Sequence, residues 1–173
     1  MILAIDPGTT ESAFVYLDPS EPKLYGFGKT GNDELREVLL LRCEQVSFVV
    51  IEAIKSYGMP MGDTTIETCV WIGRFIERWV HHVPDVPVVT IPRKTVVTEL
   101  CRSPRANDSN VRAAVLDWFR ERTNERGGGR ESMIGTAKCP GPLFGVAGDV
   151  WSALAIAIAT FEIGQREIEN ALR

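Results

Sequence analysis

The sequence predicts an α/β fold with a mixed five-stranded sheet flanked by helices. Three short apolar segments come first, separated by turn residues, as in an antiparallel three-strand meander. Further along the chain, strand-like segments alternate with amphipathic helical segments, a pattern typical of parallel strands. Because 173 residues suffice for one substantial core, we expect residues 1–173 to form a single domain.

Each predicted strand is a short run rich in aliphatic, β-branched or aromatic residues. The turns between the first three runs contain Pro7-Gly8 and then two prolines within residues 19–22. The first run, MILAID, and the fourth, VSFVVIE, both end on an acid, and Pro92 stops the fifth. The predicted strands are residues 1–6, 12–17, 23–28, 46–52 and 86–91.

The predicted helices mostly begin at Asn, Asp, Ser or Thr, the residues that commonly cap helices. The last helix is apolar all round in its first half, which predicts burial against the sheet. Residues 123–142 contain three consecutive glycines and a Pro-Gly-Pro turn, so we expect a mobile loop there and no domain boundary. The predicted helices are residues 33–44, 63–82, a short segment ending at 100, 110–122 and 149–172.

Composition narrows the class of protein. No apolar run reaches the ~18 residues that span a bilayer, and no basic segment precedes the apolar N-terminus, so we expect neither a membrane helix nor a signal peptide. The four cysteines are widely spaced and contain no Cys-x-x-Cys pair. We therefore expect reduced thiols and a cytoplasmic location, and no zinc site.

The net charge of −4 is unevenly distributed along the chain. Residues 93–138 contain ten Lys or Arg against six Asp or Glu, whereas the remainder contains nine against seventeen. A basic segment in an acidic chain is typical of a phosphate-binding surface, and equally of a solvated helical face. Charge alone leaves both interpretations open.

Three acids stand where apolar elements begin or end. Asp6 and Glu52 close two predicted strands, and Asp149 opens the buried last helix. If the first and fourth strands are parallel neighbours, the first two acids emerge side by side, and the helix can deliver the third. Converging carboxylates repel unless a divalent cation neutralises them, and oxygen ligands favour Mg²⁺ or Mn²⁺. Two such ions, about 4 Å apart, are typical of phosphodiester hydrolysis.

Each acid also has an ordinary structural interpretation. Asp6 precedes Pro-Gly and is suited to a turn, Glu52 can pair with Lys55, and Asp149 is a preferred helix cap. Singly, each acid fits this interpretation as well as the metal site. Their common order along the chain favours the site.

The strings LAIDPGTT, VVIEAIKSYG and GDVWSALAIAIAT resemble the RuvC family of Holliday-junction resolvases, and VVTIPRKTVVTEL followed by SPRANDSNVRAAVLDWF fits its middle region. Longer strings, such as GPLFGVAGDVWSALA, are most similar to RuvC-like proteins encoded by bacteriophages. The resemblance covers nearly the whole chain. It implies a ribonuclease-H-like fold and a homodimeric, metal-dependent endodeoxyribonuclease. Such an enzyme would cut branched DNA, namely four-way junctions and also forks or flaps, leaving 5′-phosphate ends.

By position, Asp6 and Glu52 match the family's first two metal-binding acids, and Asp149 matches the first acid of its closing pair. The second acid of that pair is Ser152 in this sequence. Positions three apart share a helix face, so this departure falls within the site. The resemblance leaves open whether Ser152 binds a metal through water or whether three acids suffice.

A second departure is Asp108, which stands where the family places a lysine and is suited to a helix cap. The resemblance then assigns phosphate contacts to nearby basic residues, and arginine suits bidentate binding of phosphate. Each of these residues is equally well explained as an exposed surface cation. The candidates are Arg93, Lys94, Arg102, Arg105 and Arg112.

Two further surfaces follow from the resemblance. Lys55 aligns where the family can carry an aromatic residue that enters the junction, and Tyr57 lies two positions further on. Tyr57 is suited to stacking on an unpaired base, and equally to packing on its own fold. The outer face of the 63–82 helix would form the dimer contact, with Trp71 and Phe75 as candidates.

Two rival functions remain at this stage. Asp-x-Gly-Thr-Thr also resembles the phosphate loop of actin-like kinases and ATPases, but those proteins need two such domains, and this chain is too short. A non-catalytic junction-binding protein of the same fold would explain Ser152. The presence of Asp6, Glu52 and Asp149 together favours the nuclease.

Overall fold

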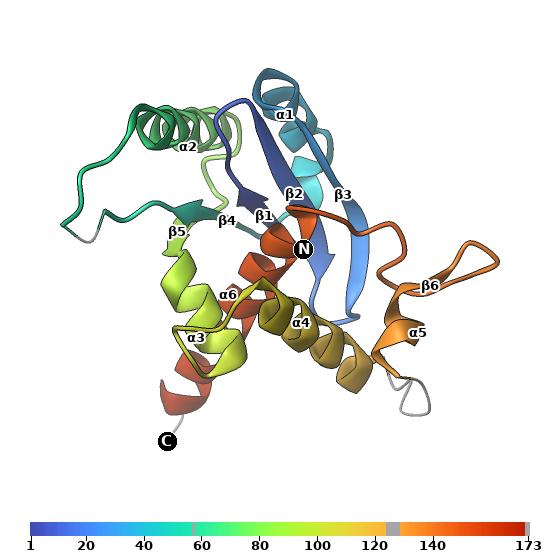
Figure 1. The fold of residues 1–173 in the computed structure, drawn as a ribbon. Helices are drawn as coiled ribbons and strands as arrows, with labels where there is room; N and C mark the ends of the chain where they lie inside the picture. The colour runs from blue at the N-terminus through green and yellow to red at the C-terminus, as the bar shows by residue number, and fades with distance from the viewer. Residues whose placement is uncertain (57, 124–128, 172–173) are drawn as a thin grey trace.

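The computed structural model describes residues 1–56, 58–123 and 129–171, and its centre is a five-stranded sheet (Figure 1). The strand order is β3-β2-β1-β4-β5. The β1–β2 and β2–β3 pairs are antiparallel, whereas β1–β4 and β4–β5 are parallel. This confirms the predicted meander joined to parallel strands. The strands are β1 (Ile2–Asp6), β2 (Glu11–Asp18), β3 (Lys23–Gly31), β4 (Phe48–Ala53) and β5 (Val88–Pro92).

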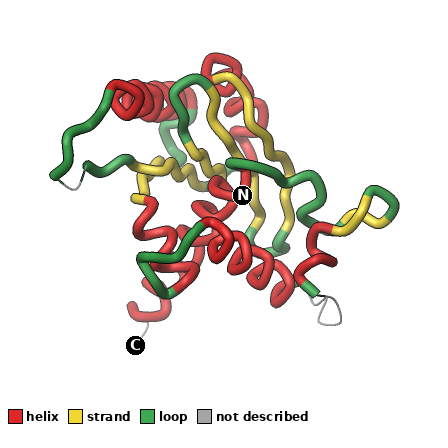
Figure 2. Tube along the Cα trace, in the orientation of Figure 1, coloured by secondary structure: helices red, strands yellow, loops and turns green. Residues whose placement is uncertain are grey.

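Helices cover both faces of the sheet (Figure 2). Alternate residues of β1 point to opposite faces, so Ile2 and Ala4 pack with α3, α4 and α6, whereas Leu3 and Ile5 pack with α1, η1 and α2. The apolar first half of the last helix lies against the sheet, as its composition predicted. The helices are α1 (Asn32–Val38), the 3-10 helix η1 (Leu39–Gln45), α2 (Asp63–His82), α3 (Arg93–Cys101), α4 (Asp108–Arg122), α5 (Arg130–Ile134) and α6 (Val150–Ala171).

A buried polar network fixes the turn between β1 and β2. The Gly8 amide donates to Ser12 Oγ at 3.1 Å, Ser12 Oγ donates to Asn32 Oδ1 at 2.6 Å, and Asn32 Nδ2 donates to the Gly8 carbonyl at 3.0 Å. A Cβ at Gly8 would lie 2.3 Å from the Glu11 carbonyl oxygen, so only glycine fits. The network therefore holds the end of β1, including Asp6, in one position.

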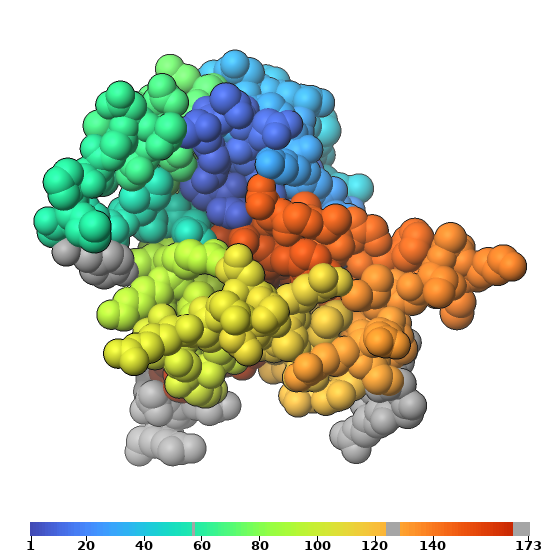
Figure 3. Space-filling model, in the orientation of Figure 1, coloured from blue at the N-terminus to red at the C-terminus, as the bar shows by residue number. Residues whose placement is uncertain are grey.

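Two predicted segments differ in detail. The expected 33–44 helix is split, because Arg42 has a non-helical backbone and the second half is the 3-10 helix η1. Within the predicted 123–142 loop, the described part contains α5 and a short ladder of β6 (Gly135–Thr136) and β7 (Cys139–Pro140), while residues 124–128 lie outside the described residues. The β6–β7 ladder projects from the rest of the molecule (Figure 3).

Candidate active site

Asp6 and Glu52 lie at the carboxyl ends of two parallel strands. Ile5 pairs with Ile51 in the β1–β4 register, so the next residue along each strand is one of the two acids. Both strands are buried up to that point, and only 16% of the Glu52 side chain is exposed. The structure thus brings this predicted pair together at one edge of the sheet.

Burial disfavours the ionised forms of both carboxyls. The pKa of Asp6 is raised from 3.8 to about 7, first by burial and then by the charges of Glu52 and Asp149. The Arg93 guanidinium and a hydrogen bond with Ser152 act in the opposite direction. Burial also raises the pKa of Glu52, although Arg93 lowers it. A cation at this position would relieve the repulsion.

Asp149 directly precedes α6 and has a cationic partner of its own. Lys29 Nζ, from β3, lies 2.9 Å from Asp149 Oδ2 and 3.5 Å from Glu11 Oε2. The Asp149 side chain is half exposed. It is close enough to Asp6 to raise the pKa of that residue, yet its charge is already compensated from the opposite side.

Arg93 links the site to the start of α4. Its Nη2 lies 2.5 Å from Asp108 Oδ1, and its Nη1 lies 3.7 Å from Glu52 Oε2, which is too long for a hydrogen bond. Glu52 Oε2 is buried and has no hydrogen-bond partner among the described residues. A buried carboxylate oxygen that accepts no hydrogen bond is costly, so the position is suited to a ligand that the oxygen can bind.

The donor set fits a divalent cation at Asp6 and Glu52. Carboxylate oxygens are the ligands that Mg²⁺ and Mn²⁺ prefer, and one of these oxygens, Glu52 Oε2, accepts no hydrogen bond among the described residues. Across the part of the chain that the structure describes, no three Asp, Glu, His or Cys side chains lie close enough to hold one ion. Asp149 would join the other two acids only by turning from Lys29.

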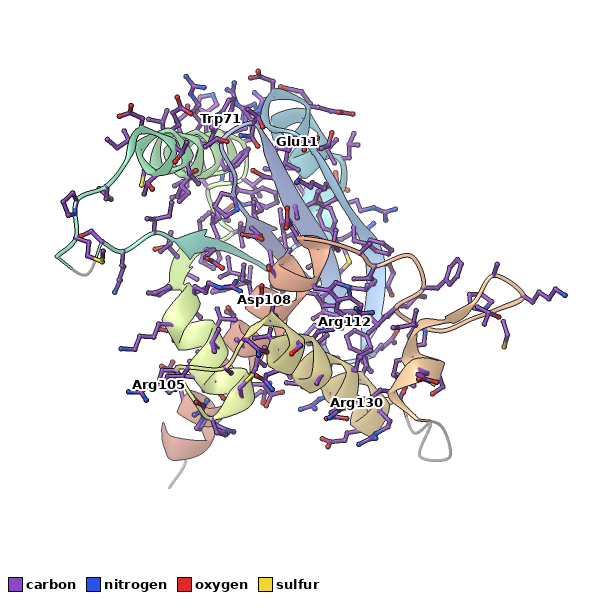
Figure 4. The ribbon with its side chains drawn as sticks, viewed as in Figure 1. Glu11, Trp71, Arg105, Asp108, Arg112 and Arg130 are labelled. Carbon is purple, nitrogen blue, oxygen red and sulfur yellow. The ribbon has the colours of Figure 1, made fainter. Side chains whose placement is uncertain are left out.

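A cleft of about 600 Å³ lies between the first turns of α4 and α6, and of the three acids it is Asp149 that lines it. Asp149 and Ser152 form one wall, and Arg93 and Arg112 contribute its cations. Figure 4 shows Asp108 and Arg112 on the part of α4 nearest the start of α6. In Figure 3, residues just before α6 fill the space between the β1–β2 turn and the α3–α4 turn.

The six described DNA-contact candidates occupy three places. Arg93 and Arg112 line the cleft, while Lys55 and Lys94 line a second hollow of about 300 Å³. Arg102 and Arg105 belong to the α3–α4 turn, where Arg102 has a left-handed φ of 55° and pairs with Glu99. The structure therefore places one pair of these candidates, Arg93 and Arg112, in the cleft that Asp149 lines.

The remaining candidates are aromatic. Tyr57 lies outside the described residues. Phe75 is fully buried beneath α2, so its assignment to a dimer contact was wrong: helical spacing does not tell which face meets the sheet. Trp71 is partly buried, with the Arg74 guanidinium 4.5 Å from its ring centroid, and its place in a dimer contact stays a prediction.

Sequence reasoning missed two site neighbours, Lys29 and Trp151. Lys29 reaches Asp149 because β3 runs beside β2 at the sheet edge, and no local signal marks that contact. Trp151 lies between Asp149 and Ser152 in sequence, and a tryptophan in the first turn of an otherwise alanine-rich helix was a usable signal. Its ring carries the Arg112 guanidinium at 4.6 Å.

The fold and the paired carboxylates place the chain among ribonuclease-H-like α/β structures. A solved structure of RuvC from Thermus thermophilus is similar to it, with a TM-score of 0.65 and 15% sequence identity over 96% of each chain. A second, of T. thermophilus RuvC in complex with Holliday junction substrate, gives a TM-score of 0.64 and 15% identity over 96% of this chain and 95% of that one. No protein-family model and no curated protein sequence matches. The likeness shows a RuvC-like fold.

Proposed function

We propose that this protein is a metal-dependent, structure-selective endodeoxyribonuclease that resolves Holliday junctions. Its substrates would include other branched DNA, such as forks and flaps, and its products would carry 5′-phosphate ends. The observation that carries the proposal is the Asp6–Glu52 pair, two largely buried carboxyls with raised pKa at the end of adjacent parallel strands. The RuvC-like fold supports the choice of substrate.

In this proposal Asp6 and Glu52 bind a divalent cation, Mg²⁺ or Mn²⁺, and Asp149 assists with a second. Bound cations of this kind activate water and stabilise the leaving oxygen in phosphodiester hydrolysis. The Gly8–Ser12–Asn32 network holds Asp6 at the end of β1. The Arg93 guanidinium partly compensates the negative charge of Glu52, and the Lys29 ammonium partly compensates that of Asp149.

A symmetric partner fits this proposal, since resolution of a four-way junction requires two incisions. The outward face of α2 carries Ile66, Val70 and Val80, each about half exposed, at 49%, 49% and 48%. Ile66, Val70 and Gly73 follow the alternating four- and three-residue spacing of a helix–helix seam, and the same spacing continues through Glu77 to Val80. We propose a homodimer that pairs α2 with its copy.

No described helix has both the length and the apolar character to cross a membrane.

A second candidate function is junction binding without cleavage. It is favoured by Ser152, which stands where the family resemblance expects an acid, and by the Lys29 and Arg93 ion pairs, which already compensate two of the three carboxylates. Such a protein would retain the basic cleft and lack the chemistry.

Cleavage of a synthetic four-way junction separates the two functions. With Mg²⁺ or Mn²⁺ we expect paired, symmetric incisions whose products can be religated, which reports 5′-phosphate ends. Asp6→Asn is expected to abolish incision and to leave junction binding intact in a gel-shift assay. Tight binding without incision in either metal would favour the binder, and undiminished cleavage by Asp6→Asn would remove Asp6 from the site.

A further inference from the structure

The two arginines of the cleft differ in how their charge is used. Arg93 is paired with Asp108 and lies near Glu52. Arg112 is exposed, and among the described residues no carboxylate lies within ion-pair distance of it. Its guanidinium instead lies 4.6 Å from the centroid of the Trp151 ring. The charge of Arg112 is therefore available to a ligand, while an aromatic ring sets its position.

A second arginine–tryptophan pair on α4 provides a comparison. The Arg122 guanidinium lies 4.4 Å from the Trp118 ring centroid. Glu162 Oε1, on α6, accepts hydrogen bonds from Arg122 Nη2 and from Trp118 Nε1, both at 2.6 Å. That pair is completed by a carboxylate and joins two helices. The Arg112–Trp151 pair has the same stacking without the anion, so an anionic ligand would complete it.

The position of Trp151 defines where that anion would lie. Trp151 is two residues after Asp149 and directly before Ser152, in the first turn of α6, and all three residues line the cleft. Partial packing against the core fixes the ring. The stacked guanidinium is therefore held in the cleft that Asp149 lines. A cleft of about 600 Å³ accommodates a phosphate with its attached sugar.

We propose that Arg112 binds a backbone phosphate of the DNA strand that passes the acids, and that Trp151 is the positioning residue that holds the Arg112 guanidinium over the cleft. The proposal rests on the proposed function, because DNA is the ligand. Arginine recognises phosphate with a planar pair of donors, and stacking reduces the freedom that this side chain loses on binding.

Junction binding in EDTA tests the proposal without cleavage. Fluorescence anisotropy of a labelled four-way junction is measured for wild type, Arg112→Ala, Trp151→Ala and the double variant, over a series of salt concentrations. Arg112→Ala is expected to reduce the slope of log K against log salt by about one. Trp151→Ala is expected to weaken binding about two- to fivefold. The double variant is expected to match Arg112→Ala, and Trp151→Phe to restore most of the affinity.

Arg122→Ala is the matched control, since it removes the same charge and stacking from the same helix at a site closed by Glu162. If Arg112→Ala binds no worse than Arg122→Ala, the phosphate site is overturned. If the effects of Trp151→Ala and Arg112→Ala add, Trp151 contacts DNA itself and its positioning role is overturned. Cleavage by wild type is measured separately, and absence of incision would overturn the proposed nuclease function. Weakened junction binding by both Arg112→Ala and Trp151→Ala would still support the phosphate site.

Discussion

Lys29 Nζ lies 2.9 Å from Asp149 Oδ2, which joins the outer strand of the meander to the residue that opens α6. The same ammonium lies 3.5 Å from Glu11, and both partners raise the pKa of Lys29. A cation contributed by the fold thus lies next to one of the three acids of the proposed metal site. The acids are therefore not equivalent: Asp6 and Glu52 are largely buried, and Asp149 is half exposed and paired with Lys29.

Replacing Lys29 by methionine is expected to increase affinity for divalent cations. The change removes a positive charge from beside Asp149 and keeps most of the aliphatic side chain. Because the pair is exposed, we expect the dissociation constant for Mn²⁺ to fall by only about two- to fivefold. Calorimetric titration without DNA measures it. Lys23→Met, on the same strand, is the control. Weaker Mn²⁺ binding by Lys29→Met would show that Lys29 orients Asp149 for the cation.

Asp6→Asn is expected to stabilise the metal-free protein at alkaline pH. The Asp6 carboxyl has a pKa of 3.8 when unperturbed and about 7 when folded. Between these values the folded protein retains a proton that the unfolded chain releases, so the free energy of unfolding falls as pH rises from 4 to 7. Asparagine avoids this loss. We expect a gain of about 2 to 4 kcal/mol at pH ~8 and almost none at pH ~4.

Urea unfolding in EDTA at several pH values measures this difference. Glu44→Gln, at an exposed position on η1, controls for the loss of one negative charge. An equal, pH-independent gain in both variants would contradict the effect of burial on Asp6. Added Mn²⁺ should stabilise wild type at pH ~8 and have little effect on Asp6→Asn, since binding to the folded state alone raises stability.

The contrast between predicted and missed residues has a physical cause. Asp6 and Glu52 could be placed together from sequence because strand ends are local signals and parallel pairing brings carboxyl ends to one edge. The contacts of Lys29 with Asp149 depend on sheet order and on the path into α6, which no local pattern encodes. Phe75 was misassigned because α2 is apolar on more than one face, and only packing shows which face meets β1 and β4.

Val70→Asp is expected to convert the proposed dimer into a monomer. Val70 is 49% exposed at the centre of the outward α2 face, so the change should leave the fold intact and place two carboxylates opposite each other in a paired seam. Sedimentation equilibrium at micromolar concentration measures the mass. Leu41→Asp, at an exposed apolar residue on η1, is the control. A wild-type protein that is monomeric, or a Val70→Asp variant that remains dimeric, would exclude the outward α2 face as the dimer interface.

Ser152→Asp is expected to strengthen divalent-cation binding and to weaken the metal-free protein. The Ser152 side chain lies close enough to Asp6 to lower the pKa of that carboxyl, and it lines the same cleft as Asp149, so an aspartate there adds a further carboxylate to the site. Repulsion should lower the free energy of unfolding by about 1 to 2 kcal/mol at pH ~8 in EDTA. The added ligand charge should lower the dissociation constant for Mn²⁺ by about tenfold.

The two effects together distinguish a metal site from a crowded surface. Repulsion between carboxylates is expected at either, but only a metal site converts it into tighter cation binding, because the cation is bound by the oxygens that repel each other. Thermal unfolding with and without MnCl₂ therefore measures both the loss of stability in the metal-free protein and the stabilisation by Mn²⁺. Ser152→Ala removes the hydroxyl without adding charge, so it should change Mn²⁺ affinity little. A Ser152→Asp variant that is destabilised in EDTA and gains nothing from Mn²⁺ would place residue 152 outside the cation's reach and favour the junction-binding function.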